Sequence, residues 1–284
     1  MSTTLGPPLP LDGPLPVAPA HSLLAAATIV PSDARHGVGG AIWPYPPGLP
    51  EAWDPCSAGT FRTKTEGQGW ELPEFQSFEV YLPITCSSIT AHSPGFADRV
   101  QLAFAATESF AVASELARGV ASGGMNPFLL DGNLNILNAG TAVNPDYGLG
   151  LLEDAIGATG RGGMILTTPA AGAALNGTGG FGLETRSGAL VTTANATPVA
   201  LDGGFIGASP SLHPVLNTGE AWAFATGPVQ IRRADNIDIV ADLRSSLDRA
   251  DNTVTFRAER SYLVTWDTQL QAGVLIDLTG CVLC

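Results

Sequence analysis

The residues with the clearest chemical spacing are three glycines, Gly177, Gly179 and Gly182, which match the pattern G-x-G-x-x-G. In a dinucleotide-binding loop this pattern follows a strand and opens a helix, so that the phosphates meet the helix N-terminus. Here an Ala-rich helical pattern precedes the glycines, and a polar stretch without periodicity follows them. The order does not suit a nucleotide site, and the sequence favours a flexible loop.

Other catalytic and metal-binding patterns are incomplete. Lys64 lacks the upstream glycines of a P-loop, and the segment 207–211 (GASPS) lacks the final glycine of a nucleophile elbow. The histidines stand beside Pro, Gly or Ser in predicted loops, and none shares a helical face with a second metal ligand. They are His21, His36, His92 and His213. We therefore expect no metal and no cofactor.

Two glutamates, Glu108 and Glu115, fall about two turns apart on one face of a predicted helix. Paired carboxylates are typical of acid–base catalysis. A solvated helix face explains the pair more simply, and we favour that interpretation. With no coherent polar constellation elsewhere, the sequence predicts that the protein is not an enzyme.

The cysteines are Cys56, Cys86, Cys281 and Cys284. The last two form C-x-x-C, but a redox pair opens a helix that lowers the thiol pKa, and no helical pattern follows here. A zinc site would need all four thiols. Cys56 and Cys86 bracket a predicted hairpin, where packed thiols are favoured, with a disulfide formed after release as the alternative.

Composition favours an ordered, loop-rich protein that covers its surface with other chains. Charged residues make up 14% of the 284 residues and hydrophobic ones 45%, with 34 Gly and 22 Pro. A protein that buries its surface against copies of itself needs less charge than a monomer. The net charge is −13 and Lys64 is the only lysine, so no basic run can neutralise phosphates. We expect no sequence-specific nucleic-acid binding.

The N-terminal residues show neither the positive flank nor the long apolar stretch of a secretory signal. The apolar run from Leu23 to Val30 is too short to span a bilayer and precedes Pro31. We therefore expect a cytosolic product without membrane contact.

The first part of the chain is predicted to be an extended arm followed by a hairpin. Prolines recur from Pro7 to Pro50 and disfavour regular helix, while apolar residues among them favour an arm that lies across other surfaces. Residues 57–85 are predicted to form a β-hairpin with a polar tip at 63–69. Its second half alternates apolar and polar residues around Phe78, as a half-exposed strand does.

The longest predicted helix runs from about Asp98, which can cap it, to Val120, and the Gly123-Gly124 pair stops it. Its apolar positions at helical spacing are Leu102, Ala106, Phe110, Ala113, Leu116 and Val120. Asn144-Pro145-Asp146 signals a second helix, and Thr168-Pro169 a third. The predicted strands are 164–166, 189–192, 197–201, 221–225, 229–232, 237–240, 253–266 and 272–278.

This order of elements resembles the Hong Kong 97-type major capsid proteins of tailed phages, whose fold bacterial encapsulins share. Particular segments are similar to versions from phages of actinobacteria, and the likeness covers about Pro55 to Leu278. These segments are 53–56 (WDPC), 162–169 (GGMILTTP), 196–200 (ATPVA), 220–229 (EAWAFATGPV) and 257–260 (RAER).

The resemblance implies an α+β fold of Hong Kong 97 type, with an N-arm, an extended β-hairpin loop, a long spine helix, and peripheral and axial domains. The implied divisions are 1–54 (Pro-rich N-terminal arm), 55–90 (extended hairpin loop), 91–180 (spine helix and start of the peripheral and axial region), 181–235 (axial-like β-rich region) and 236–284 (closing peripheral strands and tail).

The implied function is a major capsid protein that assembles as pentamers and hexamers into an icosahedral head around double-stranded DNA. Its partners would be copies of itself and the portal, together with scaffold or decoration proteins, and its location the virion, assembled in the host cytoplasm. The expected inter-subunit contacts are Trp43, Tyr45, Trp53, Phe61, Lys64, Trp70, Phe75 and Phe78. An encapsulin-type nanocompartment shell and a phage decoration or tail protein are the alternatives.

Some relatives of this type join subunits through a Lys–Asn isopeptide bond. Lys64 stands near the predicted hairpin tip, where such a lysine would be. A single lysine at a tip is more simply a solvated residue, so we expect no crosslink.

Overall fold

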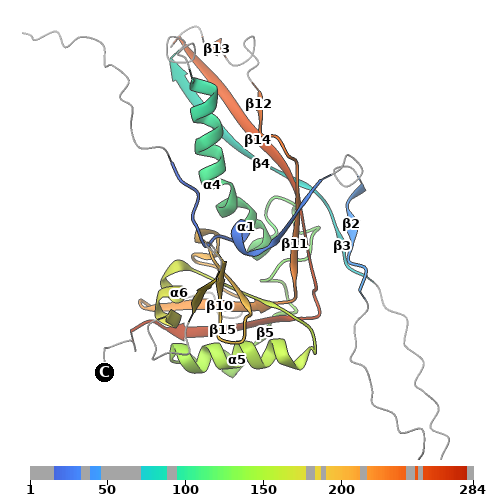
Figure 1. Cartoon of the computed structure of the whole chain (residues 1–284), viewed down its shortest axis with the longest axis vertical. Helices are drawn as coiled ribbons and strands as arrows, with labels where there is room; N and C mark the ends of the chain where they lie inside the picture. Colours follow the sequence, from blue (N-terminus) through green and yellow to red (C-terminus); the bar gives the residue numbers. More distant parts are fainter. Residues whose placement is uncertain are drawn as a thin grey trace, which may run out of the picture.

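The computed structural model places a long helix and two long strands in one part of the molecule and a second sheet in the other (Figure 1). The first part contains α4 (Phe96–Arg118), β4 (Phe78–Ser87) and β14 (Thr253–Trp266). The second contains α5 (Pro145–Ala158) and α6 (Pro169–Asn176) beside its sheet. The residues described are 16–32, 39–45, 72–87, 95–176, 183–186, 190–211, 216–240, 247–248 and 252–279.

Strand β14 is the centre of a six-stranded sheet within the described residues. β4 runs antiparallel to it, from Phe78 opposite Tyr262 to Ser87 opposite Thr253. The bounds of β14 agree with the predicted strand 253–266. Its other antiparallel neighbours are β11 (Val229–Arg233), β12 (Asp238–Val240) and β13 (Leu247–Asp248), and β1 (Thr28–Pro31) pairs parallel with β11.

The second sheet has seven strands among the described residues, and helices pack against it. Its central strands are buried throughout, because α5 contacts β10 and β15 and the apolar residues of both faces are covered. The order is β5 (Asn135–Ile136), β15 (Gln271–Asp277), β10 (Glu220–Thr226), β6 (Met164–Thr167), β9 (Pro198–Leu201), β8 (Leu190–Thr192) and β7 (Glu184–Arg186).

The shorter elements follow their local sequence signals. The side chain of Asn144 accepts a hydrogen bond from the Tyr147 amide at 2.8 Å, and Pro145 occupies the first turn, so α5 begins where it was predicted. The remaining described elements are α1 (Leu23–Ala26), β2 (Ala41–Ile42), β3 (Glu74–Phe75), and the 3₁₀ turns η1 (Leu137–Gly140) and η2 (Gly203–Phe205).

Helix α4 ends at Arg118, two residues earlier than predicted. Asp98 lies in its first turn instead of capping it, because the residue at the N-cap is Gly95. Gly119, not the Gly123-Gly124 pair, stops the helix: it is left-handed at φ 65°, and its N–H bonds to the Glu115 carbonyl. A Cβ atom at position 119 would also lie 2.6 Å from the Phe128 ring. Both the left-handed backbone and this close contact therefore require glycine.

The orientation of α4 corrects the predicted apolar face. Ala113 and Leu116 are buried as expected, but Leu102, Phe110 and Val120 are 38%, 57% and 73% exposed. The buried side of the helix instead includes Val100, Phe104, Ser109, Val112 and both glutamates. Apolar and polar residues are mixed around this helix, so the spacing of the apolar ones alone did not select the inner face.

The N-terminal segment is a second correction. Leu23 was expected in an arm without a core of its own, yet it is fully buried in this chain's core. The Leu23 amide donates to the Asp202 carboxylate at 3.1 Å, and the Leu201 amide donates to the His21 carbonyl at 2.7 Å. Residues 21–31 therefore pack on their own chain, because a short helix and strand fit between the prolines.

Sheet membership differs from the predicted divisions at two strands. β15 was placed among the closing peripheral strands, but it pairs with β10 in the seven-stranded sheet. β11 was placed in the axial-like region, but it pairs with β14 in the other sheet. The place of each strand in the sequence suggested one of the two sheets, and the strand belongs to the other sheet.

Candidate assembly surface and the buried polar cluster behind it

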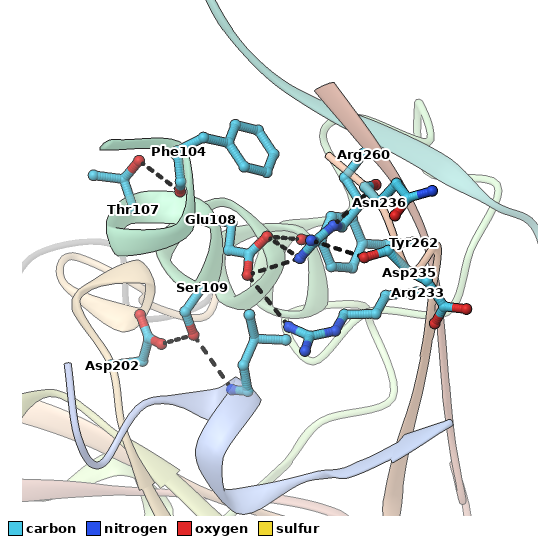
Figure 2. Close-up of polar contacts among 11 residues, drawn as sticks. Phe104, Thr107, Glu108, Ser109, Asp202, Arg233, Asp235, Asn236, Arg260 and Tyr262 are labelled. Atoms are coloured by element: carbon cyan, nitrogen blue, oxygen red, sulfur yellow. Dashed lines mark hydrogen bonds and ion pairs between the residues drawn. The ribbon is translucent and has the colours of Figure 1, made fainter. Parts of the chain in front are cut away.

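A buried carboxylate joins α4 to the six-stranded sheet (Figure 2). The Glu108 side chain is 5% exposed and accepts from Arg260 Nη1 at 2.9 Å and from Arg233 Nη1 at 3.3 Å. The Tyr262 hydroxyl donates to the same carboxylate. A charge removed from water is tolerated only when it is paired and hydrogen-bonded, and these three donors meet that requirement.

The strand register brings the three donors together. Arg260 and Tyr262 are two residues apart on β14 and so face the same side, and Arg233 on β11 lies directly opposite Tyr262. Arg260 also donates to the carbonyls of Asp235 at 3.3 Å and Asn236 at 3.4 Å. The Arg260 guanidinium is thereby held by these carbonyls as well as by Glu108, and its fixed place determines the position of α4 on the sheet.

Tyr262 is a permanent donor in this cluster. Burial raises the pKa of its phenol above the ordinary range, and the hydrogen bond to Glu108 and the charge of that carboxylate raise it further. Arg260 opposes the shift without reversing it. The Tyr262 ring also stacks on Phe78, with the ring centroids 6.1 Å apart.

The two glutamates do not form a solvated face, contrary to the sequence interpretation. Glu115 is also buried, and its carboxylate accepts from the backbone amides of Ala121 and Ser122 beyond the helix end. The two carboxylates thus have separate partners and separate tasks. Both hold structure in place, so the arrangement suits positioning and not proton transfer.

No direct indication of this cluster comes from the sequence alone. Glu108 was noticed for its spacing to Glu115, and Arg260 only as part of the segment 257–260. The partners are 125 to 154 residues from Glu108 along the chain. The available indication was that Phe104 and Val112 lie four residues before and after Glu108, so that the glutamate falls on an apolar row of the helix, where a charge needs a partner.

The outer surface carries several exposed apolar side chains. Phe110 on α4 and Ile206, just after η2, are 57% and 63% exposed. The other large apolar residues that are exposed among those described are Val17, Ile42, Tyr45, Tyr81, Leu102, Val120, Met125, Tyr147 and Val240. A protein that functioned alone would gain solubility from polar residues at these positions, so this surface is a candidate for contact with other chains.

Three of the expected contact residues are buried in their own chain, which corrects that expectation. Trp43, Phe75 and Phe78 are 8%, 1% and 7% exposed, because β2, β3 and β4 fold onto the core. Tyr45 is 61% exposed and packs edge-on against Trp43, so it stays a predicted contact. The other expected contacts, Trp53, Phe61, Lys64 and Trp70, lie outside the described residues.

The other patterns considered from sequence add no site in the described part of the chain. It contains no group of three or more His, Cys, Asp or Glu side chains that could hold a metal ion. The glycines at 177, 179 and 182 lie outside the described residues, between helix α6 and strand β7.

Of the four cysteines, Cys86 is described and is half-buried, whereas Cys56, Cys281 and Cys284 lie outside the described residues. Packed thiols at Cys56 and Cys86, with a disulfide as the alternative, therefore stay a prediction. Among the described helices, none is both long and apolar enough to cross a membrane.

Comparisons with protein-family models and with curated protein sequences give no match. Solved structures do match over nearly their whole length. A structure from Mycobacterium phage Adephagia is 14% identical, with 97% of this chain and 95% of that chain covered and a TM-score of 0.57. The capsid of an empty GTA particle is 14% identical, with 98% and 91% covered and a TM-score of 0.51. The holo-SrpI encapsulin complex from Synechococcus elongatus PCC 7942 is 12% identical, with 96% and 92% covered and a TM-score of 0.56.

These neighbours share the fold of icosahedral shell proteins. The chain therefore has the Hong Kong 97-type capsid fold, and the predicted α+β class is confirmed.

Replacing Glu108 with Ala should lower the free energy of unfolding by about 3–5 kcal/mol, because two arginines lose their buried partner. Glu79→Ala on β4 is the matched control: this exposed glutamate should change stability by no more than about 0.5 kcal/mol. Urea unfolding of the unassembled chain measures both. Equal, small losses in the two variants would show that the cluster does not hold α4.

Stability should fall with rising pH above about 10, where tyrosine ionises in the unfolded chain but Tyr262 in the folded chain does not. The unfolded state then binds fewer protons, so its free energy drops relative to the folded state. Tyr262→Phe should remove about 1.4 kcal/mol per pH unit of this slope. Unfolding free energies between pH 9 and 11.5 test this, and parallel curves for the two proteins would contradict it.

Proposed function

We propose that the chain is the major capsid protein of a tailed bacteriophage and assembles as pentamers and hexamers into an icosahedral head around double-stranded DNA. The observation that carries the proposal is the match over almost the full length of both chains to shell proteins, most of them from phages. Self-association follows from the same likeness. Portal, scaffold and decoration proteins are the further partners we propose, with assembly in the host cytoplasm.

The surface supports a structural role. Exposed apolar side chains occur on α5 and on strand β4, as they would on a subunit with several neighbours. The net charge of −13 with a single lysine suits the wall of a container, because an acidic lining does not bind packed DNA tightly. We propose no enzymatic activity, and the shell proteins it matches support this.

An encapsulin-type shell is the second candidate, because the encapsulin match has nearly the same TM-score as the phage match. The two functions differ in what the shell contains. A phage head holds DNA that nucleases cannot reach, whereas an encapsulin holds a cargo protein. Genes for a terminase and a portal beside this gene would favour the first, and a gene for a cargo enzyme the second.

The chain should form closed particles, either alone or with phage partner proteins. Negative-stain microscopy of the expressed protein and of host lysate checks this, and nuclease-protected DNA in lysate particles would favour the phage head. Monomers that persist under all conditions, including with partners present, would contradict both shell functions.

The particles should dissolve to single-chain bands on a denaturing gel, because we expect Lys64 to be a solvated residue and not part of an isopeptide bond. Lys64→Arg particles are the control and should give the same bands. A ladder of covalent oligomers that disappears in Lys64→Arg would show instead that Lys64 joins subunits.

A further inference from the structure

The outward face of α4 is an apolar strip that nothing in the described structure covers. Leu102 and Phe110 belong to one row of side chains along the helix, with Ala106 between them. Ile206 continues the strip beside Phe110, since the turn η2 passes over that ring and a side chain at Gly203 would lie 3.2 Å from it. An apolar stripe on a helix normally faces other protein and not water.

The first fifteen residues of the sequence have chemistry that matches this strip. Residues 1–15 lie outside the described structure, and Asp12 is the only charged side chain among them. Their leucines, Leu5, Leu9, Leu11 and Leu15, alternate with Pro7, Pro8, Pro10 and Pro14. Proline-rich segments favour an extended polyproline conformation, and they bind to apolar and aromatic surfaces at a low entropic penalty.

Helix α1, seven residues after the described start of the chain, is held next to the strip. The Asp202 carboxylate accepts from the Leu23 amide at 3.1 Å and from the Ser109 hydroxyl at 2.6 Å, and Ser109 immediately precedes Phe110. In Figure 1 the first described residues, drawn blue, approach α1 from the side of α4 that faces away from β4 and β14. The N-terminal segment therefore begins close to one end of the strip.

The length of the connection favours docking on the same chain. The seven Cα–Cα steps from Leu15 to Ser22 span at most about 25 Å, whereas Phe110 and Leu102 are only about 12 Å apart along the helix. A short tether gives an effective concentration on the order of millimolar. In dilute solution the segment of a separate copy cannot match that concentration.

We infer that residues 5–15 dock along the strip formed by Leu102, Phe110 and Ile206 of the same chain. This contact covers the outer face of α4 in the single subunit. It concerns the individual chain and does not rest on the proposed shell function.

Photo-crosslinking of the full-length chain tests the inference. A photoreactive phenylalanine analogue replaces Leu11, and isotopically light and heavy copies are mixed before illumination. Mass spectrometry then shows which peptides are joined and whether they come from one copy or two. We expect crosslinks within one copy to peptides that contain residues 102–110 or 203–207.

Phe110→Ser should lower the yield of this crosslink roughly fivefold or more, because the apolar area for docking is lost. Leu102→Ser is a second variant of the strip and should act in the same direction. Tyr147→Ser is the matched control, since Tyr147 on α5 is similarly exposed, at 54%, but lies outside the strip. Thermal unfolding of each variant checks that the fold is retained.

Crosslinks between light and heavy copies, crosslinks to other regions, an absence of crosslinks, or a yield that Phe110→Ser and Leu102→Ser leave unchanged would each overturn the inference. Particle formation is scored separately by microscopy. Failure of the docking contact is thus distinguishable from failure of the proposed function.

Discussion

The burial of the Glu108 carboxylate is the constraint on which the arrangement of this chain depends. A carboxylate in a protein interior must keep its charge partners, so α4 can occupy only the position in which Arg233, Arg260 and Tyr262 all reach it. The next residue, Ser109, bonds to Asp202 and so fixes η2 and the N-terminal helix α1 relative to the same face. Two adjacent residues of one helix therefore position four separate parts of the chain.

This constraint also explains the exposed surface. With Glu108 directed inward, the rotation of α4 is fixed, and Leu102 and Phe110 must point outward although they are apolar. Glycine allows the close approach on the inner side: a side chain at Gly204 would lie 2.5 Å from the Phe110 carbonyl. The apolar strip is thus a consequence of the buried polar cluster, and residues 5–15 are the cover that we infer for it.

The likeness to shell proteins belongs to the fold and not to particular side chains. At 12–14% identity, nearly the whole chain still superposes on phage, GTA and encapsulin subunits. What such distant chains share is the pattern of elements, which many sequences can satisfy with different packing. The Glu108 cluster is therefore best regarded as the way in which this sequence fixes its long helix on that framework.

The sequence by itself determined the elements and their order, because caps, turns and periodicity are local properties. Asn144 and Pro145 start α5, and the alternation around Phe256 marks β14. Only the tertiary structure decided which face of α4 turns inward, which sheet takes β11 and β15, and that Leu23 and Phe75 enter the core. These choices depend on contacts such as Glu108 with Arg260, 152 residues apart, and no local pattern encodes a partner at that distance.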